Sequence, residues 1–128
     1  NAALGINQVR ELHRFLQKRS EIEQVFREAL LRSRHSALLE EGRNVNFSFP
    51  VLVKQGRAEL RRYAEKRGIE TEPAFGDSVL TVEGASLSGP GEYPNAGELL
   101  RRTLLFPLYP SLARKDVQLL CKVLSTLP

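Results

Sequence analysis

The chain contains no methionine, one cysteine and two histidines among its 128 residues. The single cysteine, Cys121, excludes an intramolecular disulfide, and the cytoplasm is then the expected location. The two histidines, His13 and His35, do not form the His-x-x-x-His pair of a zinc site, so no bound metal is expected. The absence of methionine indicates either that the start was removed or that the chain is part of a longer one.

Long apolar runs and catalytic motifs are also missing. No apolar run approaches the roughly 20 residues of a membrane span, and the segment Asn1–Ile6 lacks the basic and then apolar order of a secretory signal. The sequence contains no Gly-x-Ser-x-Gly nucleophile elbow, no Gly-x-Gly-x-x-Gly fingerprint and no Walker-type phosphate loop. The residues alone therefore predict a domain without a self-contained catalytic site.

The net charge of +4 and the pI of about 9.6 permit weak attraction to polyanions. Basic residues cluster between positions 57 and 67, but Glu59 and Glu65 are interleaved with them. This mixture favours a solvated helix face over a nucleic-acid surface. Arg101 and Arg102 have the same two interpretations, and nucleic acid is not the expected partner.

The hydrophobic pattern predicts an α+β domain. Apolar residues make up 41% of the chain, enough to form a core. The expected order is helix 2–33, strand 45–53, helix 57–67, strand 69–72, loop 73–93, helix 94–102, strand 103–106 and helix 113–127. This order is typical of a small, mainly antiparallel sheet with helices packed on one side, and we expect a single domain over residues 1–128.

The first helix is too long for a domain of this size. Apolar residues recur along it at helical spacing, and at 1.5 Å per residue it is roughly 45 Å long. Its N-terminal turns therefore need another surface to pack on. The small-residue segment Ala2–Gly5 suits a close contact with either a second subunit or an absent domain.

Prolines and glycines mark the ends of the other elements. Pro107 and Pro110 stop the apolar strand that begins at Thr103, and Ser111 is positioned to cap the last helix. Pro50 indicates an edge position or a bulge for the strand around it. Gly68 is the expected C-cap of the helix that begins at Arg57.

Four segments, in the same order, resemble the C-terminal part of sugar aminotransferases of the DegT/StrS type. The opening segment resembles the family's "AALG-x-x-QL" motif, the join after the second helix resembles "GI-x-T/R", and the proline-rich stretch resembles "P-x-A-E…LPLYP-x-L". The segments are Asn1–Val9, Arg19 with Phe26–Leu30, Arg67–Thr71, and Pro94–Ala96 followed by Leu105–Leu112. Together they cover almost the whole chain.

This resemblance implies a fold-type I enzyme dependent on pyridoxal phosphate, usually a homodimer, that transfers an amino group, usually from glutamate, to a nucleotide-linked keto sugar. The chain would be the C-terminal small domain only. Its five lysines, at positions 18, 54, 66, 115 and 122, fall outside the family's Schiff-base motif. No catalytic or cofactor-binding residue is therefore expected here, and the chain alone should be inert.

The family often carries a histidine-containing substrate loop after the "GI-x-T" strand. In this sequence that region has no histidine, and the candidates that the resemblance implies for the loop are Phe75, Gly76, Asp77 and Ser78. Two other interpretations remain open. One is a free-standing, non-enzymatic module that dimerises or binds a partner through the first helix, and the other is a weak polyanion binder.

Overall fold

The computed structural model describes residues 2–38, 47–76 and 93–128. Within them the helices are α1 (Ala2–Leu30), α2 (Arg57–Glu65), α3 (Pro94–Arg102) and α4 (Arg114–Ser125). The strands are β1 (Ser36–Ala37), β2 (Ser48–Leu52), β3 (Glu72–Pro73) and β4 (Thr103–Pro107). These strands form one antiparallel sheet in the order β1-β2-β4-β3, and the expected α+β class is confirmed.

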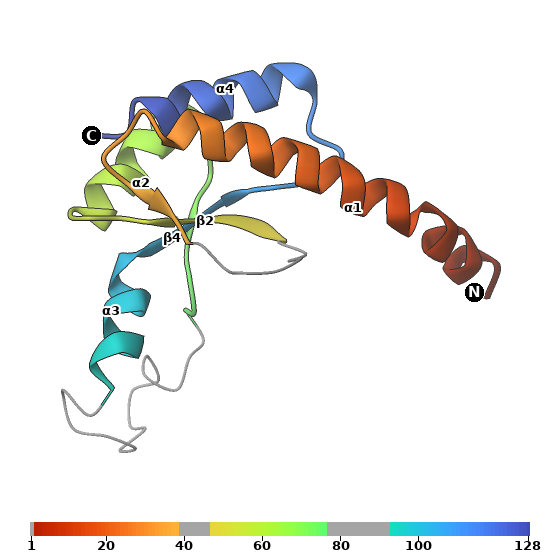
Figure 1. Cartoon of the computed structure of the whole chain (residues 1–128), viewed down its shortest axis with the longest axis horizontal. Coiled ribbons are helices and arrows are strands. Elements are labelled where there is room, and N and C mark those ends of the chain that lie inside the picture. The colour runs from red at the N-terminus through yellow and green to blue at the C-terminus, as the bar shows by residue number, and fades with distance from the viewer. Residues whose placement is uncertain (1, 39–46, 77–92) are drawn as a thin grey trace.

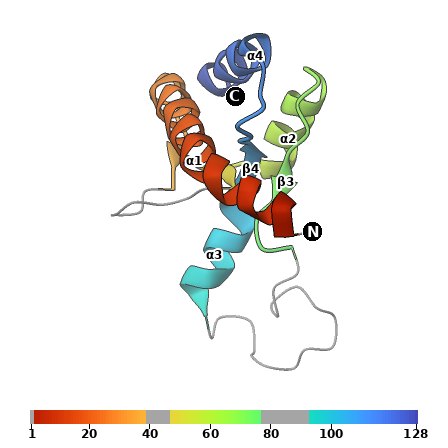
Figure 2. The ribbon, with the colours of Figure 1, turned by 90° about the vertical axis from the view of Figure 1, so that its right-hand side faces the viewer.

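Three of the helices cover one face of the sheet. Figures 1 and 2 show α1, α2 and α4 above the sheet, whereas α3 extends below it. The long helix α1 packs alongside α4, and α2 contacts β4. None of the described helices combines the length and the apolar character needed to cross a bilayer.

The core lies between the sheet and this helical layer. Side chains alternate between the two faces of a strand, and this alternation directs Phe49 and Val51 of β2 and Leu104 and Phe106 of β4 to the helices, where all four are buried. Phe26 of α1 meets Phe49 edge to face, with ring centroids 5.6 Å apart and planes inclined by 69°, a geometry that aromatic quadrupoles favour. The sheet and the helix layer are thus joined through aromatic contact.

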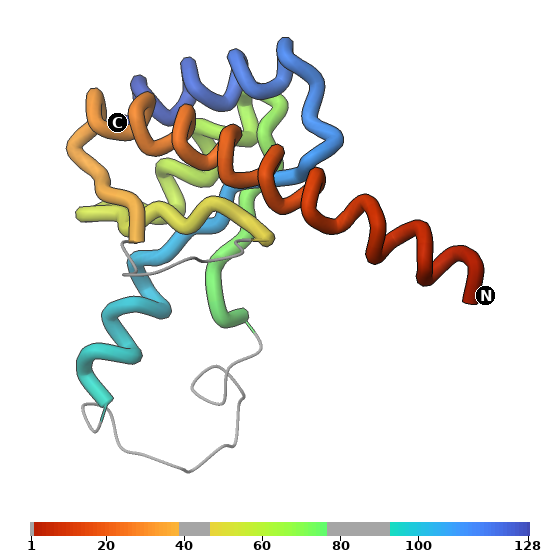
Figure 3. Tube along the Cα trace, turned by 45° about the vertical axis from the view of Figure 1, so that its right-hand side comes forward, coloured from red at the N-terminus to blue at the C-terminus, as the bar shows by residue number. Residues whose placement is uncertain are grey.

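Only the C-terminal half of α1 contributes to this core. Ile22, Phe26 and Leu30 are buried, whereas Leu4 is 68% exposed and Val9 is 71% exposed. Ile6, Leu12 and Phe15 are also exposed. Figure 3 shows the N-terminal half of α1 extending beyond the rest of the chain. The expected long helix is confirmed, although it ends at Leu30 rather than at residue 33.

Pro50 does not mark an edge strand. It lies in β2, which is flanked by β1 and β4, and it is the register partner of Leu105. The backbone N–H of Leu38 donates to the carbonyl oxygen of Pro50 at 3.2 Å. The oxygen and nitrogen of a strand residue face the same neighbour, so the missing proline donor faces the end of the short strand β1. The ladder with β4 therefore keeps its hydrogen bonds.

Several other helix and strand ends differ from those expected from the sequence. Ser111 does not cap α4, because the N-cap is Ala113 and no side chain caps it. The short strand expected at 69–72 lies instead at Glu72–Pro73. The C-cap of α2 is Lys66 rather than the expected Gly68. Gly68 follows it with a φ of 76°, and Ile69 donates its backbone N–H to the carbonyl oxygen of Ala64. Strand β1 was not expected, and residues 77–92 of the expected loop 73–93 lie outside the described residues.

Leu30 and Leu31 provide a matched test of this core. Leu30 is 2% exposed, whereas its neighbour Leu31 is 84% exposed. Leu30→Ala should lower the free energy of unfolding by about 2–5 kcal/mol, because it leaves a cavity in the core. Leu31→Ala should change it by less than about 0.5 kcal/mol. Urea unfolding followed by circular dichroism measures both, and equal effects would contradict the packing of α1 described above.

Candidate functional site

Residues Phe75 and Gly76 follow β3 and precede the segment 77–92. The backbone N–H of Ala74 donates to the carbonyl oxygen of Thr103 at 3.2 Å, which fixes this point against the start of β4. Of the four loop candidates, the structure places Phe75 and Gly76, which are adjacent and both exposed. Asp77 and Ser78 lie outside the described residues.

Phe75 has an unusual backbone conformation. Its φ is 60°, and no other non-glycine residue of the described chain has a positive φ. A left-handed conformation costs an L-residue roughly 1–2 kcal/mol, and such residues gather at functional loops and turns. The Phe75 side chain is 58% exposed, so burial of its ring does not offset this cost.

On the C-terminal side of the segment 77–92, side-chain hydrogen bonds hold the end of α3 in place. The guanidinium of Arg57 donates to the carbonyl oxygen of Leu100 at 2.5 Å, and Arg102 Nε donates to the carbonyl oxygen of Val53 at 2.8 Å. Arg102 also forms an ion pair with Glu98. Arg102 therefore anchors the junction of α3 and β4 to the end of β2, a structural role that the sequence did not reveal.

The outer face of the sheet carries a groove of about 200 Å³ near β3. Its lining includes Glu70, Glu72, Ser48, Leu105 and Tyr109. Glu72 pairs with Leu105, and Ser48 pairs with Pro107, so the groove crosses three strands. The i, i+2 spacing of Glu70 and Glu72 was the available sequence signal, since it predicts that both carboxylates lie on one face of an extended segment.

His35 connects three distant segments. Its Nε2 lies 2.8 Å from the backbone oxygen of Pro128, and its Nδ1 accepts the backbone N–H of Lys54 at 3.3 Å. Because Nδ1 accepts, Nε2 carries the proton and donates to Pro128. Arg34 Nε donates to the same oxygen at 3.1 Å. This cluster of Arg34, His35, Lys54 and Pro128 holds the C-terminal residues against the ends of α1 and β2.

Burial lowers the pKa of His35 below its ordinary value, and the nearby charges of Arg34 and Lys54 act in the same direction. The hydrogen bond to Pro128 raises the pKa, but less than burial lowers it. Protonation also removes the acceptor that Lys54 uses. The folded cluster therefore favours the neutral imidazole.

The described residues form neither a metal site nor an enclosed site for a reactive lysine. Nowhere in residues 2–38, 47–76 and 93–128 do three or more histidine, cysteine or acidic side chains gather to hold a metal. All five lysines are exposed, so none occupies the enclosed, desolvated position that suits a Schiff-base lysine. Burial raises the pKa of the Cys121 thiol, which disfavours the reactive thiolate. The residues that the structure describes therefore do not fit pyridoxal phosphate.

The fold described above matches part of several solved structures. The aminotransferase TlmJ of Streptoalloteichus hindustanus superposes with a TM-score of 0.80 at 23% identity, with 97% of this chain and 34% of that chain covered. DesV of S. venezuelae gives 0.85 at 22% identity, with 97% and 34% covered. The sugar aminotransferase CalS13 of Micromonospora echinospora gives 0.78 at 15% identity, with the same two coverages.

The family model of the DegT/DnrJ/EryC1/StrS aminotransferases matches residues 1–125, and the chain belongs to this family. It spans about a third of the length of the solved aminotransferases that it matches. The comparison with curated proteins gives no match. The resemblance expected from the sequence motifs is confirmed.

Phe75 permits a test of its backbone strain. Phe75→Gly and Phe75→Ala remove the same ring, but only glycine adopts a positive φ without steric cost. We expect the glycine variant to be more stable than the alanine variant by about 1 kcal/mol. Thermal unfolding of the two variants measures the difference. Greater stability of the alanine variant would show that Phe75 is not held at a positive φ.

The cluster around His35 predicts a loss of stability in acid. The unfolded histidine titrates near a pKa of about 6.5, whereas the pKa of the folded His35 is lower. Between these two values the unfolded chain binds more protons, so stability is complete above about pH 6.5 and falls as the pH drops below it. His35→Gln should remove this part of the pH dependence.

His13→Gln is the matched control, since His13 is the other histidine of the chain and lies exposed on α1. Urea unfolding at a series of pH values between 8 and 5 measures both variants. We expect the His13 variant to keep the slope of the unmodified chain. If the His13 variant lost the pH dependence and the His35 variant kept it, His13 rather than His35 would cause the loss of stability in acid.

Proposed function

We propose that this chain is the C-terminal small domain, residues 1–128, of a pyridoxal-phosphate-dependent aminotransferase that acts on a nucleotide-linked keto sugar. The observation that supports this proposal best is the coverage: nearly all of this chain matches about a third of TlmJ, DesV and CalS13. CalS13 is itself described as a sugar aminotransferase. In the family, the cofactor supplies the electron sink for amino transfer when it is bound.

We do not expect the chain's own residues to supply the cofactor site. Its five exposed lysines leave the Schiff base to the other two thirds of the enzyme. We therefore expect the cofactor, the reactive lysine and the acid that pairs with the pyridine nitrogen to belong to the large domain. In this proposal the isolated small domain is inert. The full-length enzyme that contains it is a homodimer in the cytoplasm.

The role that we assign to this chain is to border the substrate. Phe75 and Gly76 begin the proposed substrate loop, which continues through Asp77 and Ser78. Three hydrogen bonds to backbone carbonyl oxygens support a fixed position for the base of this loop. The backbone N–H of Ala74 donates to Thr103, and the side chains of Arg57 and Arg102 donate to Leu100 and Val53. A loop anchored on both sides can orient a sugar and limit the access of water to it.

The first helix supplies the contact with the missing part. Leu4, Val9, Leu12 and Phe15 are exposed large apolar residues within twelve positions, and a patch of this kind marks an interaction surface. Spacings of seven and four residues place Phe15 on the same helix face as Ile22 and Phe26. The exposed surface therefore continues the core face of α1, and the large domain is the partner that we assign to it.

A second candidate function rests on the same surface. The exposed face of α1 also suits a non-enzymatic module that dimerises or binds a separately encoded partner. In that case the native protein would have the 14.4 kDa mass of this chain and would self-associate through α1. The aminotransferase proposal requires a larger native protein.

The isolated chain should show no amino transfer. With pyridoxal phosphate, glutamate and a nucleotide-linked keto sugar added, we expect no amino sugar by mass spectrometry, because no enclosed lysine is present to hold the cofactor. The full-length native protein, identified by its intact mass, is the positive control and should form the amino sugar. Amination by the isolated chain would refute its inertness, and a native mass of 14.4 kDa would favour the module.

A further inference from the structure

Arg19 lies in the middle of the apolar face of α1. It follows Phe15 by four residues and precedes Ile22 by three, and such spacings place side chains on one face of a helix. Phe15 is exposed and Ile22 is buried, so Arg19 lies where the exposed part of this face meets the part that packs on the sheet. A charge at this position stands out, because helix faces that pack against other surfaces are mostly apolar.

The side chain of Arg19 is partly enclosed. Its guanidinium carbon lies 5.0 Å from the centroid of the Phe47 ring, which is itself exposed just before β2. The Nε atom of Arg19 is buried without a hydrogen-bond acceptor, and no other side-chain nitrogen of the described residues is in this position. A buried N–H group without an acceptor costs free energy. Arg19 therefore requires an acceptor beyond those that the described residues supply.

No carboxylate of the described residues pairs with Arg19. Glu23 lies four residues further along α1, at the spacing that favours an ion pair, but its carboxylate accepts two hydrogen bonds from the guanidinium of Arg27. Glu11 forms an ion pair with Arg14. The guanidinium of Arg19 thus keeps its full positive charge on an otherwise apolar helix face.

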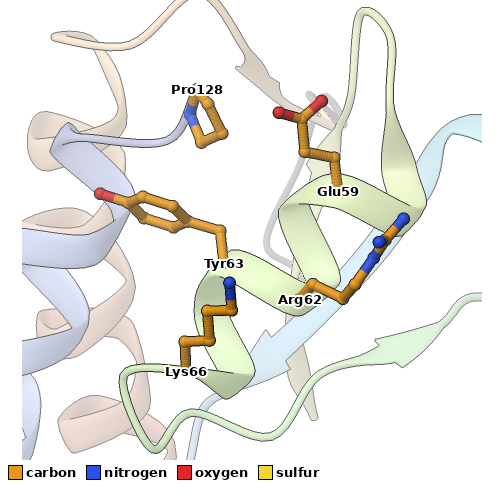
Figure 4. A pocket seen from close by; sticks show the side chains of 5 residues that line it. All are labelled: Glu59, Arg62, Tyr63, Lys66 and Pro128. Carbon is orange, nitrogen blue, oxygen red and sulfur yellow. The ribbon is translucent and has the colours of Figure 1, made fainter.

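Arg62 provides a comparison within the same chain. It lines a groove of about 400 Å³ between α2 and the C-terminal residues. Figure 4 shows its side chain pointing away from that of Lys66, and its Nε donates to the carbonyl oxygen of Ala58 at 3.3 Å. This surface arginine has an acceptor within its own helix, whereas Arg19 has none among the residues that the structure describes.

A partner that covers the exposed face of α1 removes water from Arg19. Leu12 and Phe15 are exposed apolar residues of this face, seven and four residues before Arg19, so a surface packed on them also covers the guanidinium. A buried charge is tolerated when it is paired and hydrogen-bonded. A wholly apolar partner surface would leave the guanidinium unpaired, whereas a carboxylate can accept two parallel hydrogen bonds from it.

We propose that the partner surface of α1 presents a carboxylate to Arg19, and that this partner is the large domain of the same enzyme. The inference rests on the proposed function, because this chain covers 34% of TlmJ and of DesV and the remainder of such an enzyme supplies the large domain. The complementary surface then consists of apolar side chains around one aspartate or glutamate. Pairing of this charge fixes the position of α1 on the large domain.

Other roles for Arg19 lead to different results. If its contact with Phe47 were its main role, loss of the guanidinium would destabilise the 128-residue chain by itself. A carboxylate elsewhere in this chain would give the same result. A carbonyl oxygen of the partner would accept a hydrogen bond from a neutral amide, whereas a buried carboxylate also requires the positive charge.

The test introduces Arg19→Met into the 128-residue chain and into the full-length native enzyme. Methionine keeps an apolar, unbranched side chain and removes the charge. In the full-length enzyme Tm should fall by at least about 4 °C, because the partner carboxylate is left buried and unpaired. In the 128-residue chain Tm should change by less than about 2 °C. Differential scanning calorimetry measures both.

Arg10→Met is the matched control. Arg10 is exposed and lies nine residues before Arg19, about two and a half helical turns, which places it on the opposite side of α1. Its replacement should change the Tm of the full-length enzyme by less than about 1 °C. Arg19→Gln supplies a neutral donor and should lower Tm as Arg19→Met does. Arg19→Lys keeps the charge without the planar fork and should lower Tm less.

Three results would overturn the inference: an equal loss of Tm in the 128-residue chain, no loss in the full-length enzyme, or an unchanged Tm with Arg19→Gln, which would indicate a carbonyl acceptor. Amino-sugar formation is measured in parallel. A full-length protein that Arg19→Met destabilises but that forms no amino sugar would support the inference and refute the proposed function. An active full-length enzyme that Arg19→Met leaves unchanged would do the reverse, and a native mass of 14.4 kDa would refute both.

Discussion

The pairing of β2 with β4 is the interaction on which the rest of the structure depends. Five register pairs join the two strands, and Phe49 lies directly opposite Phe106. Both rings are buried in the core, and Phe26 of α1 packs edge to face against Phe49. The strands β1 and β3 are each attached to one member of this pair. Because its two strands are separated by fifty residues of sequence, the pair brings both halves of the chain into one core.

The helices could be predicted from the sequence more accurately than the edges of the sheet. Apolar periodicity is a property of one segment, and it located all the described helices to within a few residues. Strand β1 has only two residues, Ser36 and Ala37, with no periodic signal. Pro50 was misinterpreted because its tolerance depends on which neighbour its nitrogen faces. A short strand forms only where another segment pairs with it, and the residues of the strand do not indicate which segment that is.

The candidate sites likewise include residues that a local sequence pattern identifies and residues that depend on a distant partner. Phe75 and Gly76 were proposed as candidates through a motif, because their neighbours along the chain carry the resemblance. The contact of His35 with Pro128 spans 93 residues, and that of Arg102 with Val53 spans 49. No local pattern identifies such pairs. Likewise, the basic run of residues 57–67 looked like a uniform solvated face, but Arg61 pairs with Glu65 whereas Arg62 Nε donates to the carbonyl oxygen of Ala58.

The exposed half of α1 gives this chain a mechanical property. An α-helix is stiff along its axis, and α1 is clamped to the core only around Ile22, Phe26 and Leu30. Ala2 lies about 30 Å along the helix from Ile22, so a rotation of about 10° at the clamp displaces it by about 5 Å. A domain attached at the N-terminal end of α1 is therefore displaced whenever α1 rotates relative to the sheet. Small changes of packing at Phe26 become large changes in the position of that domain.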